Sequence, residues 1–318
     1  MNEVAVIVVN YNGGAHLGRC LRALIGQRAA SFDVVVVDNG STDGSLEDLG
    51  ELPSHFRVLR AGRNLGFAAA NNLGIRESRS EWVALLNPDA FPDSEWLSRL
   101  LAAARGRSGF DFFASRTVLA DRPERLDGAG DAYHVSGLFW RRGHGKDARE
   151  LFLEEEEVFC ACAAAAMYRR SALDRVGGFD EDYFCYAEDV DLGFRLRLAG
   201  FRCLYVPDAV VAHVASAITG RRSDFSVYHG HRNLVWTYVK NMPTPLFWCY
   251  LPLHLLLNVV TLGWFAVRGQ ARVIGRAKWD AVKALPHVWR KRRQVQDTRC
   301  ATARDLHRVM TTGWALKR

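Results

Sequence analysis

The stretch VAVIVVNYNGGAHLGRCLRALIGQ, from Val4 to Gln27, decides the fold class. Its first part, Val4 to Val9, is a run of small and β-branched apolar residues, which is typical of a strand buried on both faces. From His16 to Gln27 the apolar residues instead recur at the spacing of a helix with one apolar face. A buried strand followed by an amphipathic helix indicates one unit of a parallel α/β sheet.

The same alternation continues through the first hundred residues. Further strands are predicted at Phe32 to Val37, Phe56 to Leu59 and Trp82 to Leu86, and further helices at Phe67 to Ile75 and from an N-cap at Ser94 to Ala104. This order predicts an α/β fold with a mostly parallel sheet and helices on both faces. Ligands bind such sheets beyond the carboxyl ends of the strands.

Polar residues gather at these strand ends. They are Asn10 to Asn12, Asp38 to Ser41 and Asn87 to Asp89, and a second acidic patch, YAEDVDLGFR from Tyr186 to Arg195, adds Glu188, Asp189 and Asp191. Carboxylates beside apolar runs are costly to bury, so they indicate a chemical role. The patch that ends at Asp89 can hold a divalent metal through oxygen ligands, and the second patch can supply a general base. Together they predict group transfer from a phosphorylated donor.

The second half of the chain is less regular. Residues 121 to 157 are polar and rich in glycine and charge, which predicts an excursion over the surface. Val158 to Tyr168 is predicted to be a strand, with Cys160 and Cys162 as buried strand thiols, and Asp189 to Gly200 is predicted to be a helix that stops at the glycine. Seven cysteines without CxxC spacing, and an N-terminus without a secretory signal, indicate a reducing cytosol.

The C-terminal region combines an apolar segment with a basic tail. Leu246 to Val267 is about 33 Å long if helical, which fits a bilayer span. Pro252 and a polar stripe of His254, Asn258 and Thr261 equally fit an interfacial or re-entrant helix. Residues 268 to 318 hold 14 Lys and Arg against 3 Asp and Glu, a net charge of +11, whereas the preceding residues carry −4. Such a tail predicts contact with anionic lipid, because no nucleic-acid motif accompanies it.

Several motifs occur in the order found in one known family. They are VVNYN from Val8, VVDNGSTDGS from Val36, NLGFAAANN from Asn64, LLNPDA from Leu85, GGFDEDYFCYAEDVDLGFRLRLAGF from Gly177, and then His213. The chain resembles glycosyltransferase family 2, and within it the rhamnosyltransferase-like branch that acts in cell-surface polysaccharide assembly. The resemblance covers roughly residues 4 to 240. It implies a GT-A fold, which is Rossmann-like, a nucleotide-sugar donor, a divalent cation and inversion at the anomeric carbon.

This resemblance divides the chain into two regions. Residues 1–240 would form the GT-A domain, with a nucleotide-sugar half at about 1–115 and an acceptor half at about 116–240. Residues 241–318 would form a helical, membrane-associated region of one apolar helix and a basic tail.

The resemblance also implies a set of donor-binding residues. They are Asn10, Tyr11, Asn12, Asp38, Asn64, Gly66, Asn71 and Asn87. The Tyr11 ring can stack on a base, and the Asp38 carboxylate can accept the N3–H of uracil or thymine. Asp38 to Asp43 also fits an Asx-turn that caps the next helix, and Gly66 fits a simple need for positive φ.

Metal binding and catalysis are implied at the remaining positions. Asp89 is the expected contact to Mn²⁺ or Mg²⁺, whereas Asn87 occupies the place of the first acid in this motif and offers only a carbonyl oxygen. His213 is either a further ligand or a structural histidine. The family places its general base at Asp189, with Glu188 orienting the acceptor.

Other functional classes fit less well. A processive polysaccharide synthase would carry QxxRW, whereas Arg232 to Trp236 is RNLVW. A nucleotidyltransferase or a dinucleotide-dependent oxidoreductase would need a glycine-rich phosphate loop after the first strand, and the loop NYNGGAHLG lacks that pattern. A non-catalytic protein that binds sugar nucleotides or acts as a scaffold remains an alternative because of Asn87. The expected partners are a dTDP- or UDP-sugar, with dTDP-rhamnose first, a glycan or polyprenyl-diphosphate-linked acceptor, and an anionic membrane surface, but no nucleic acid. The expected location is the cytoplasmic face of the cell membrane, peripheral or re-entrant.

Overall fold

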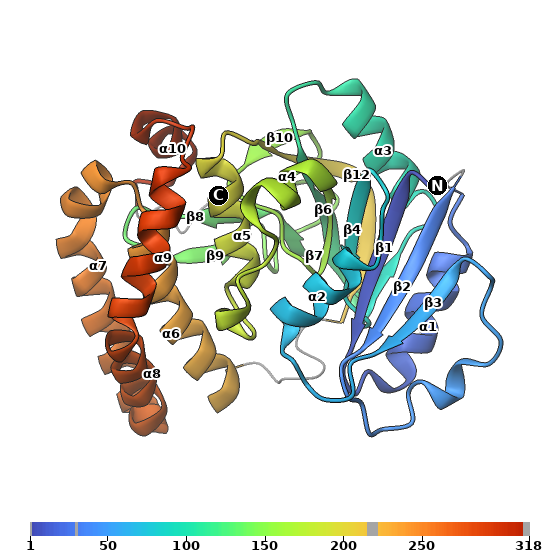
Figure 1. Ribbon diagram of the computed structural model, residues 1–318, viewed down its shortest axis with the longest axis horizontal. Helices are drawn as coiled ribbons and strands as arrows, with labels where there is room; N and C mark the ends of the chain where they lie inside the picture. The colour runs from blue at the N-terminus through green and yellow to red at the C-terminus, as the bar shows by residue number, and fades with distance from the viewer. Residues whose placement is uncertain (1, 29–30, 215–221, 314–318) are drawn as a thin grey trace.

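The computed structural model describes residues 2–28, 31–214 and 222–313 (Figure 1). Its main sheet contains β1 (Val4–Asn10), β2 (Phe32–Asp38), β3 (Phe56–Arg60), β4 (Trp82–Leu86), β5 (Ala90–Pro92), β6 (Phe112–Leu119), β7 (Arg122–Ala129), β10 (Glu156–Val158), β11 (Ala165–Arg169) and β12 (Cys203–His213). The short strands β8 (Asp131–Tyr133) and β9 (Phe139–Arg141) form a separate antiparallel pair. The sheet path runs β10-β12-β6-β11-β4-β1-β2-β3.

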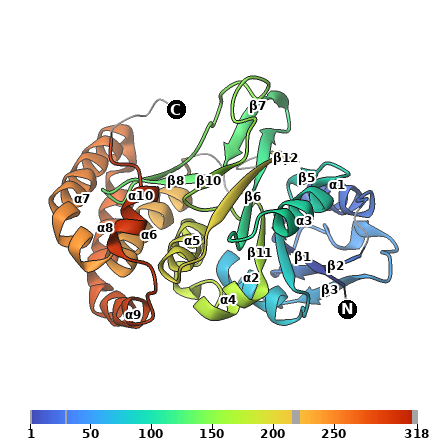
Figure 2. The same ribbon diagram turned by 90° about the horizontal axis from the view of Figure 1, so that it is seen from above.

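Helices follow most of the N-terminal strands. They are α1 (Gly14–Ile25), α2 (Phe67–Arg76), α3 (Trp96–Gly106), α4 (Arg170–Val176) and α5 (Glu188–Leu198), and then the C-terminal helices α6 (Asp224–Asn241), α7 (Thr244–Phe265), α8 (Ala271–Lys283), α9 (Leu285–Asp297) and α10 (Ala303–Val309). Figure 2 shows the C-terminal helices gathered at the end of the molecule opposite β1, β2 and β3.

Alternate residues of β1 explain why both faces of the sheet are covered. Val4, Val6 and Val8 pack on one face with α1 and α3, and the residues between them pack on the other face with α2, α4 and α5. A strand that is apolar at every position has to be buried on both sides. The predicted α/β sheet with helices on both faces is therefore confirmed.

The parallel character of the sheet is limited to part of it. Strands β3, β2, β1 and β4 are all parallel, but β11 lies between β4 and β6 and runs antiparallel to both. The predicted strand from Val158 to Tyr168 is two separate strands, because β10 ends at Val158 and β11 begins only at Ala165. Cys160 and Cys162 lie between them, so the prediction of strand thiols is wrong, although Cys160 is buried.

Two further predictions need correction. Helix α3 begins at Trp96 with Glu95 at the N-cap, and Ser94 instead hydrogen-bonds the Asp93 carboxylate. Residues 121–157 are only partly a surface excursion, because they include β7, β8 and β9 and they bury Asp127 and Asp131. A segment that pairs with the sheet edge can bury polar side chains while its average composition stays polar.

Candidate donor and metal site

The carboxyl ends of β1 and β2 lie side by side, since Asn10 and Asp38 are paired in the parallel register. The Asn10 side chain is fully buried, and its Nδ2 donates to the hydroxyls of Ser41 at 3.0 Å and Ser45 at 2.9 Å. Asp38 Oδ1 accepts from the Ser41 backbone N–H at 3.3 Å. Asn10 and Asp38 thus both hold the loop after β2 in place.

The residues that follow β1 differ in their exposure. Tyr11 is 37% exposed, so its ring can be reached by a base. Asn12 adopts a φ of 53°, its Oδ1 accepts from the Thr42 N–H at 2.8 Å, and its own N–H donates to Ser41 Oγ at 3.0 Å. Asn12 therefore connects the loop after β1 with the loop after β2.

A third loop, which precedes α2, joins these two through Asn39. Asn39 Oδ1 accepts from the Leu65 N–H at 2.8 Å, and its Nδ2 donates to Asn64 Oδ1 at 3.0 Å. Gly66 has a φ of 85°, and a Cβ at this position would lie 2.5 Å from the Phe184 ring. Asn39 belongs to the polar stretch Asp38 to Ser41 noted in the sequence, but it was not among the expected donor-binding residues. Glycine is required here both for the backbone conformation and for the close approach.

Asn71 lies in α2, away from the loop connections. Its side chain is 2% exposed and donates to the Phe67 carbonyl oxygen of the same helix at 2.9 Å. The donor-binding roles of all these residues stay predictions, since the contacts described define the loops.

Asp89 and His213 are brought together by pairing of β5 with β12, in which Ala90 is opposite His213. The Val214 N–H donates to the Asp89 carbonyl oxygen at 3.0 Å, which closes the pair. Asp89 Oδ1 then lies 3.3 Å from His213 Nε2, and both side chains are almost fully buried. Two predicted ligands from positions more than a hundred residues apart therefore converge.

The second nitrogen of His213 faces Asp127, a residue that the sequence analysis did not select. His213 Nδ1 lies 2.9 Å from Asp127 Oδ2, and Arg141 forms an ion pair with the same carboxylate. Burial alone would raise the pKa of Asp127, but the Arg141 charge and hydrogen bonds from His144 and His213 hold it well below its ordinary range. For His213, burial alone would lower the pKa, but the hydrogen bonds to Asp127 and Asp89 outweigh it and raise the pKa above its ordinary value.

This arrangement fits a divalent cation. Metal-binding histidines characteristically present one ring nitrogen to the ion and donate the other N–H to a carboxylate, and His213 has Asp127 in the second position. The Asp89 carboxylate supplies an oxygen 3.3 Å from Nε2, the ring nitrogen that would face the ion. Asn87 Oδ1 is buried and lacks a hydrogen-bond partner among the described residues, which also fits an oxygen that serves a ligand.

Asp189 lies in the first turn of α5. Its Oδ2 accepts from the Ala163 N–H at 3.2 Å and its Oδ1 from its neighbour Val190 at 2.8 Å. The carboxylate is only partly buried, so one side of it can meet an acceptor. Glu188 is 6% exposed, and burial, followed by the nearby Asp189 charge, raises its pKa well above the ordinary value. The catalytic roles of both residues stay predictions.

A second group of side chains surrounds Asp189. Ligand atoms of Asp131, Cys162 and Asp189 lie within 4.8 Å of one another, a spacing that could hold a metal. Arg141 Nη2, however, donates to Cys162 Sγ at 2.8 Å, so a guanidinium already supplies positive charge to this group. The pair of Asp89 and His213 is therefore the better cation site. Arg141 contacts both Asp127 and Cys162, and so it connects the metal pair with the surroundings of Asp189.

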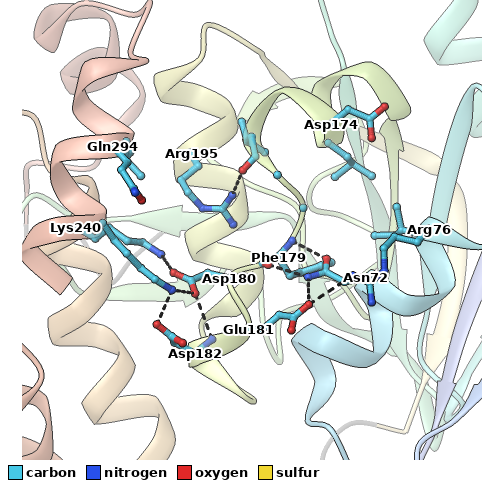
Figure 3. A pocket seen from close by; sticks show the side chains of 17 residues that line it. Asn72, Arg76, Asp174, Phe179, Asp180, Glu181, Asp182, Arg195, Lys240 and Gln294 are labelled. Atoms are coloured by element: carbon cyan, nitrogen blue, oxygen red, sulfur yellow. Dashed lines mark hydrogen bonds and ion pairs between the residues drawn. The ribbon is translucent and has the colours of Figure 1, made fainter. Parts of the chain in front are cut away.

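A pocket of ≈ 660 Å³ lies elsewhere, between α2, α4, α6 and α9 (Figure 3). Among the described residues that line it, none is a predicted donor, metal or catalytic residue. Its wall contains a buried ion network in which Lys240 pairs with Asp180 and, at 2.8 Å, with Asp191, while Lys291 of α9 also pairs with Asp180. The network joins α9 to α6 and to Asp180, in the segment between α4 and α5.

Comparisons with known proteins identify the family of the chain. The family model of glycosyl transferase family 2 matches residues 5–177, and that of glycosyl transferase family group 2 matches residues 127–275. The chain is 35% identical over 243 residues to an N-acetylglucosaminyl-diphospho-decaprenol L-rhamnosyltransferase of Mycobacterium tuberculosis, which covers 68% of this chain and 77% of that protein.

Two solved structures share the fold. One is the mannosyltransferase PcManGT from Pyrobaculum calidifontis in complex with GDP-Man and Mn²⁺, with a TM-score of 0.57 and 19% identity over 97% of this chain and 86% of that one. The other is GalNAc-T7 with UDP, GalNAc and Mn²⁺, with a TM-score of 0.61 and 16% identity over 76% of this chain and 48% of that one. The chain therefore belongs to glycosyl transferase family 2, in its rhamnosyltransferase-like branch, and is a glycosyltransferase with a GT-A fold.

Proposed function

We propose that this enzyme transfers a sugar, with inversion, from a pyrimidine nucleoside-diphosphate sugar to a lipid-linked glycan at the cytoplasmic face of a membrane. The observation that carries the proposal is the contact chain of Asp89, His213 and Asp127, in which the two His213 nitrogens lie 3.3 Å and 2.9 Å from carboxylate oxygens. A relative that is named as a rhamnosyltransferase acting on a decaprenol-linked sugar supports rhamnose as the first sugar to test and a polyprenyl diphosphate as the carrier.

The donor would lie across the three joined loops at the carboxyl ends of β1 and β2. Tyr11 supplies an exposed ring for stacking, and Asp38 lies opposite the preceding residue, Asn10, at the end of the neighbouring strand. The loop at Asn64 to Gly66 is fixed by Asn39 and would close over the nucleotide. Because hydrogen bonds between the loops hold them in place before any ligand arrives, little ordering is needed on binding.

Asp89 and His213 would hold a divalent cation, Mn²⁺ or Mg²⁺, with the donor diphosphate completing the coordination. When bound, this ion would offset the negative charge that develops on the departing nucleoside diphosphate. Asp127 would keep the His213 ring in the orientation and tautomer that leave Nε2 free for the ion. The nitrogen ligand favours Mn²⁺ over Mg²⁺.

Asp189 would act as the general base. Its carboxylate takes the proton of an acceptor hydroxyl while that oxygen forms a bond to the anomeric carbon. The bond between this carbon and the diphosphate oxygen breaks on the opposite side, and the electron pair leaves with the nucleotide. Two backbone N–H groups orient the Asp189 carboxylate, so that it is held in place before the acceptor binds.

The test uses purified full-length protein with a panel of dTDP- and UDP-sugars and a polyprenyl-diphosphate-linked acceptor. We expect nucleotide release with dTDP-rhamnose in Mn²⁺ and none in excess EDTA, and an NMR spectrum of the product with the anomeric configuration inverted. Asp89→Ala should abolish metal-dependent donor binding, whereas Asp174→Asn, which changes an exposed carboxylate, should not. Full activity in EDTA, or retention of configuration, would overturn this mechanism. Binding of donor without any turnover would favour a non-catalytic protein.

A further inference from the structure

Helix α7 presents a long uncharged face to the outside, here termed the outer α7 face. The chain from Thr244 to Phe265 contains no Asp, Glu, Lys or Arg. The outer α7 face consists of Pro245, Trp248, Pro252, Leu255, Leu256, Val259, Val260 and Trp264, with Val267 just after the helix, all exposed. These residues recur every three or four positions, so they form one continuous stripe. An exposed apolar stripe of this length marks a site of contact with a membrane or another protein.

The opposite side of α7 contacts α6 and the turn at Ser136 near its start, in its middle and at its end. Near its start, the Phe247 ring packs against Tyr238 at 5.4 Å between centroids. In the middle, His254 stacks on Tyr238 at 3.9 Å and hydrogen-bonds the Ser136 carbonyl oxygen at 2.8 Å. At its end, Phe265 contacts the His231 ring at 4.8 Å.

These contacts decide between a span and a surface helix. By length and composition, the segment Thr244–Lys283 could cross a membrane, and it is the one such helix among the described residues. A crossing would separate one end of α7 from α6, yet both ends and the middle lie on α6 or on the Ser136 turn. After a turn with Gly269 at a φ of 83°, α8 returns and packs on α6 as well. The hairpin of α7 and α8 therefore fits a helix that lies in the plane of an interface.

The residues at the ends of the stripe indicate what covers it. Trp248 and Trp264 lie 16 residues apart, about 24 Å along the helix, and tryptophan favours the boundary between lipid and water. Arg268 stacks over Trp264 at 4.0 Å, and Arg272 and Arg276 are exposed on α8. An uncharged stripe beside arginines matches the acyl region and the anionic headgroups of a bilayer.

We propose that the outer α7 face docks in the plane of an anionic lipid bilayer, with the arginines at the start of α8 on the headgroups. A second copy of the chain is the competing occupant. Residues 244–265 contain no Asp or Glu, so the stripe of a second copy would offer these arginines no opposite charge. The headgroups of an anionic bilayer do offer it.

Docking of this kind would place the membrane, and with it the acceptor, near the acceptor half of the chain. This inference deepens the proposed function and rests on it. The Ser136 turn that His254 contacts joins β8 to β9, and these strands carry Asp131 and Arg141 next to Asp189. One packed helix, α7, would therefore lie between a bilayer that holds the lipid-linked acceptor and the strands next to the proposed base, Asp189.

The test measures cosedimentation of the full chain with vesicles of phosphatidylcholine alone or mixed with phosphatidylglycerol. We expect binding to the mixed vesicles that falls as salt rises. The double variant Leu255→Glu with Val259→Glu should lose at least about tenfold in vesicle affinity, since it puts two carboxylates into the stripe. Ile25→Glu, a similar change at an exposed site on α1, should leave the affinity unchanged.

Two further readouts keep the proposal falsifiable. Mn²⁺-dependent binding of donor nucleotide should be equal in all three proteins, which separates loss of docking from misfolding and from failure of the proposed function. Light scattering after gel filtration should give the same molar mass for wild type and for the double variant. Unchanged vesicle binding by the double variant, or a wild-type dimer that it abolishes, would overturn the lipid assignment.

Discussion

Replacing Asp131 by asparagine should stabilise the protein increasingly as the pH rises. Asp131 is 6% exposed, and its Oδ1 has no hydrogen-bond partner within the described part of the chain. Burial, followed by the negative charge of Asp189, raises the pKa of Asp131 to about 7. A carboxyl whose pKa is higher in the folded state favours folding while it is protonated. Its contribution is complete below the unfolded pKa of roughly 4 and is lost as the pH rises through about 7.

The size of the effect follows from the shift. In the pH range where the folded state keeps a proton that the unfolded state has lost, the unfolding free energy falls by about 1.4 kcal/mol per pH unit. Between about pH 5 and about pH 8, wild-type protein should therefore lose roughly 3 kcal/mol that Asp131→Asn does not lose, because the amide is neutral throughout. The order of magnitude is unaffected by solvent screening, since the side chain is buried.

The assay is urea unfolding of wild type, Asp131→Asn and the exposed control Asp174→Asn at both pH values. We expect the difference in unfolding free energy between Asp131→Asn and wild type to grow in favour of the variant at the higher pH, and the control to follow wild type. Asp189→Asn should reduce the same pH dependence, because it removes the largest charge contribution to the raised pKa of Asp131. An equal difference at both pH values would refute the reasoning.

Three further predictions follow from buried contacts. Asp127→Asn removes the charge that faces His213 Nδ1. The affinity for Mn²⁺ in the presence of nucleotide, measured by isothermal calorimetry, should therefore fall about 10- to 100-fold. An unchanged affinity would argue against metal binding by His213. Lys240→Met leaves Asp180 and Asp191 with fewer positive partners, and should cost about 3 kcal/mol of unfolding free energy in urea; a loss below about 1 kcal/mol would mean that the ion network contributes little. Gly66→Ala and Gly62→Ala both place an alanine at positive φ, but only residue 66 meets a neighbour, the Phe184 ring at 2.5 Å. The variant at residue 66 should therefore bind donor nucleotide more weakly than the variant at residue 62, with equal affinities as the contrary result.

The N-terminal half of the fold could be predicted because its signals are local. The apolar run of β1 and the matching run of β4 are continuous in sequence, and the structure places both strands as predicted. The antiparallel insertion of β11 could not be predicted, because its direction depends on the path of residues 159–164 and not on its own composition.

The site divides in the same way. Asp89 and His213 were found from motif positions, and their convergence needed the pairing of β5 with β12. Asp127, Asp131 and Arg141 were missed because they lie in a segment whose average polarity hides the buried positions. The partners of Lys240 lie about fifty residues or more away in sequence, so no local pattern could reveal them.

The central claim is that Asp189 accepts the proton of the acceptor while a separate group, Asp89 with His213, holds the cation and the donor. The most direct test measures, in the same preparation of Asp189→Asn, the Mn²⁺-dependent affinity for donor nucleotide and the rate of sugar transfer. The account predicts an affinity equal to that of wild type and a transfer rate lower by about 10²- to 10⁴-fold. Transfer at the wild-type rate, or loss of donor binding together with transfer, would contradict it.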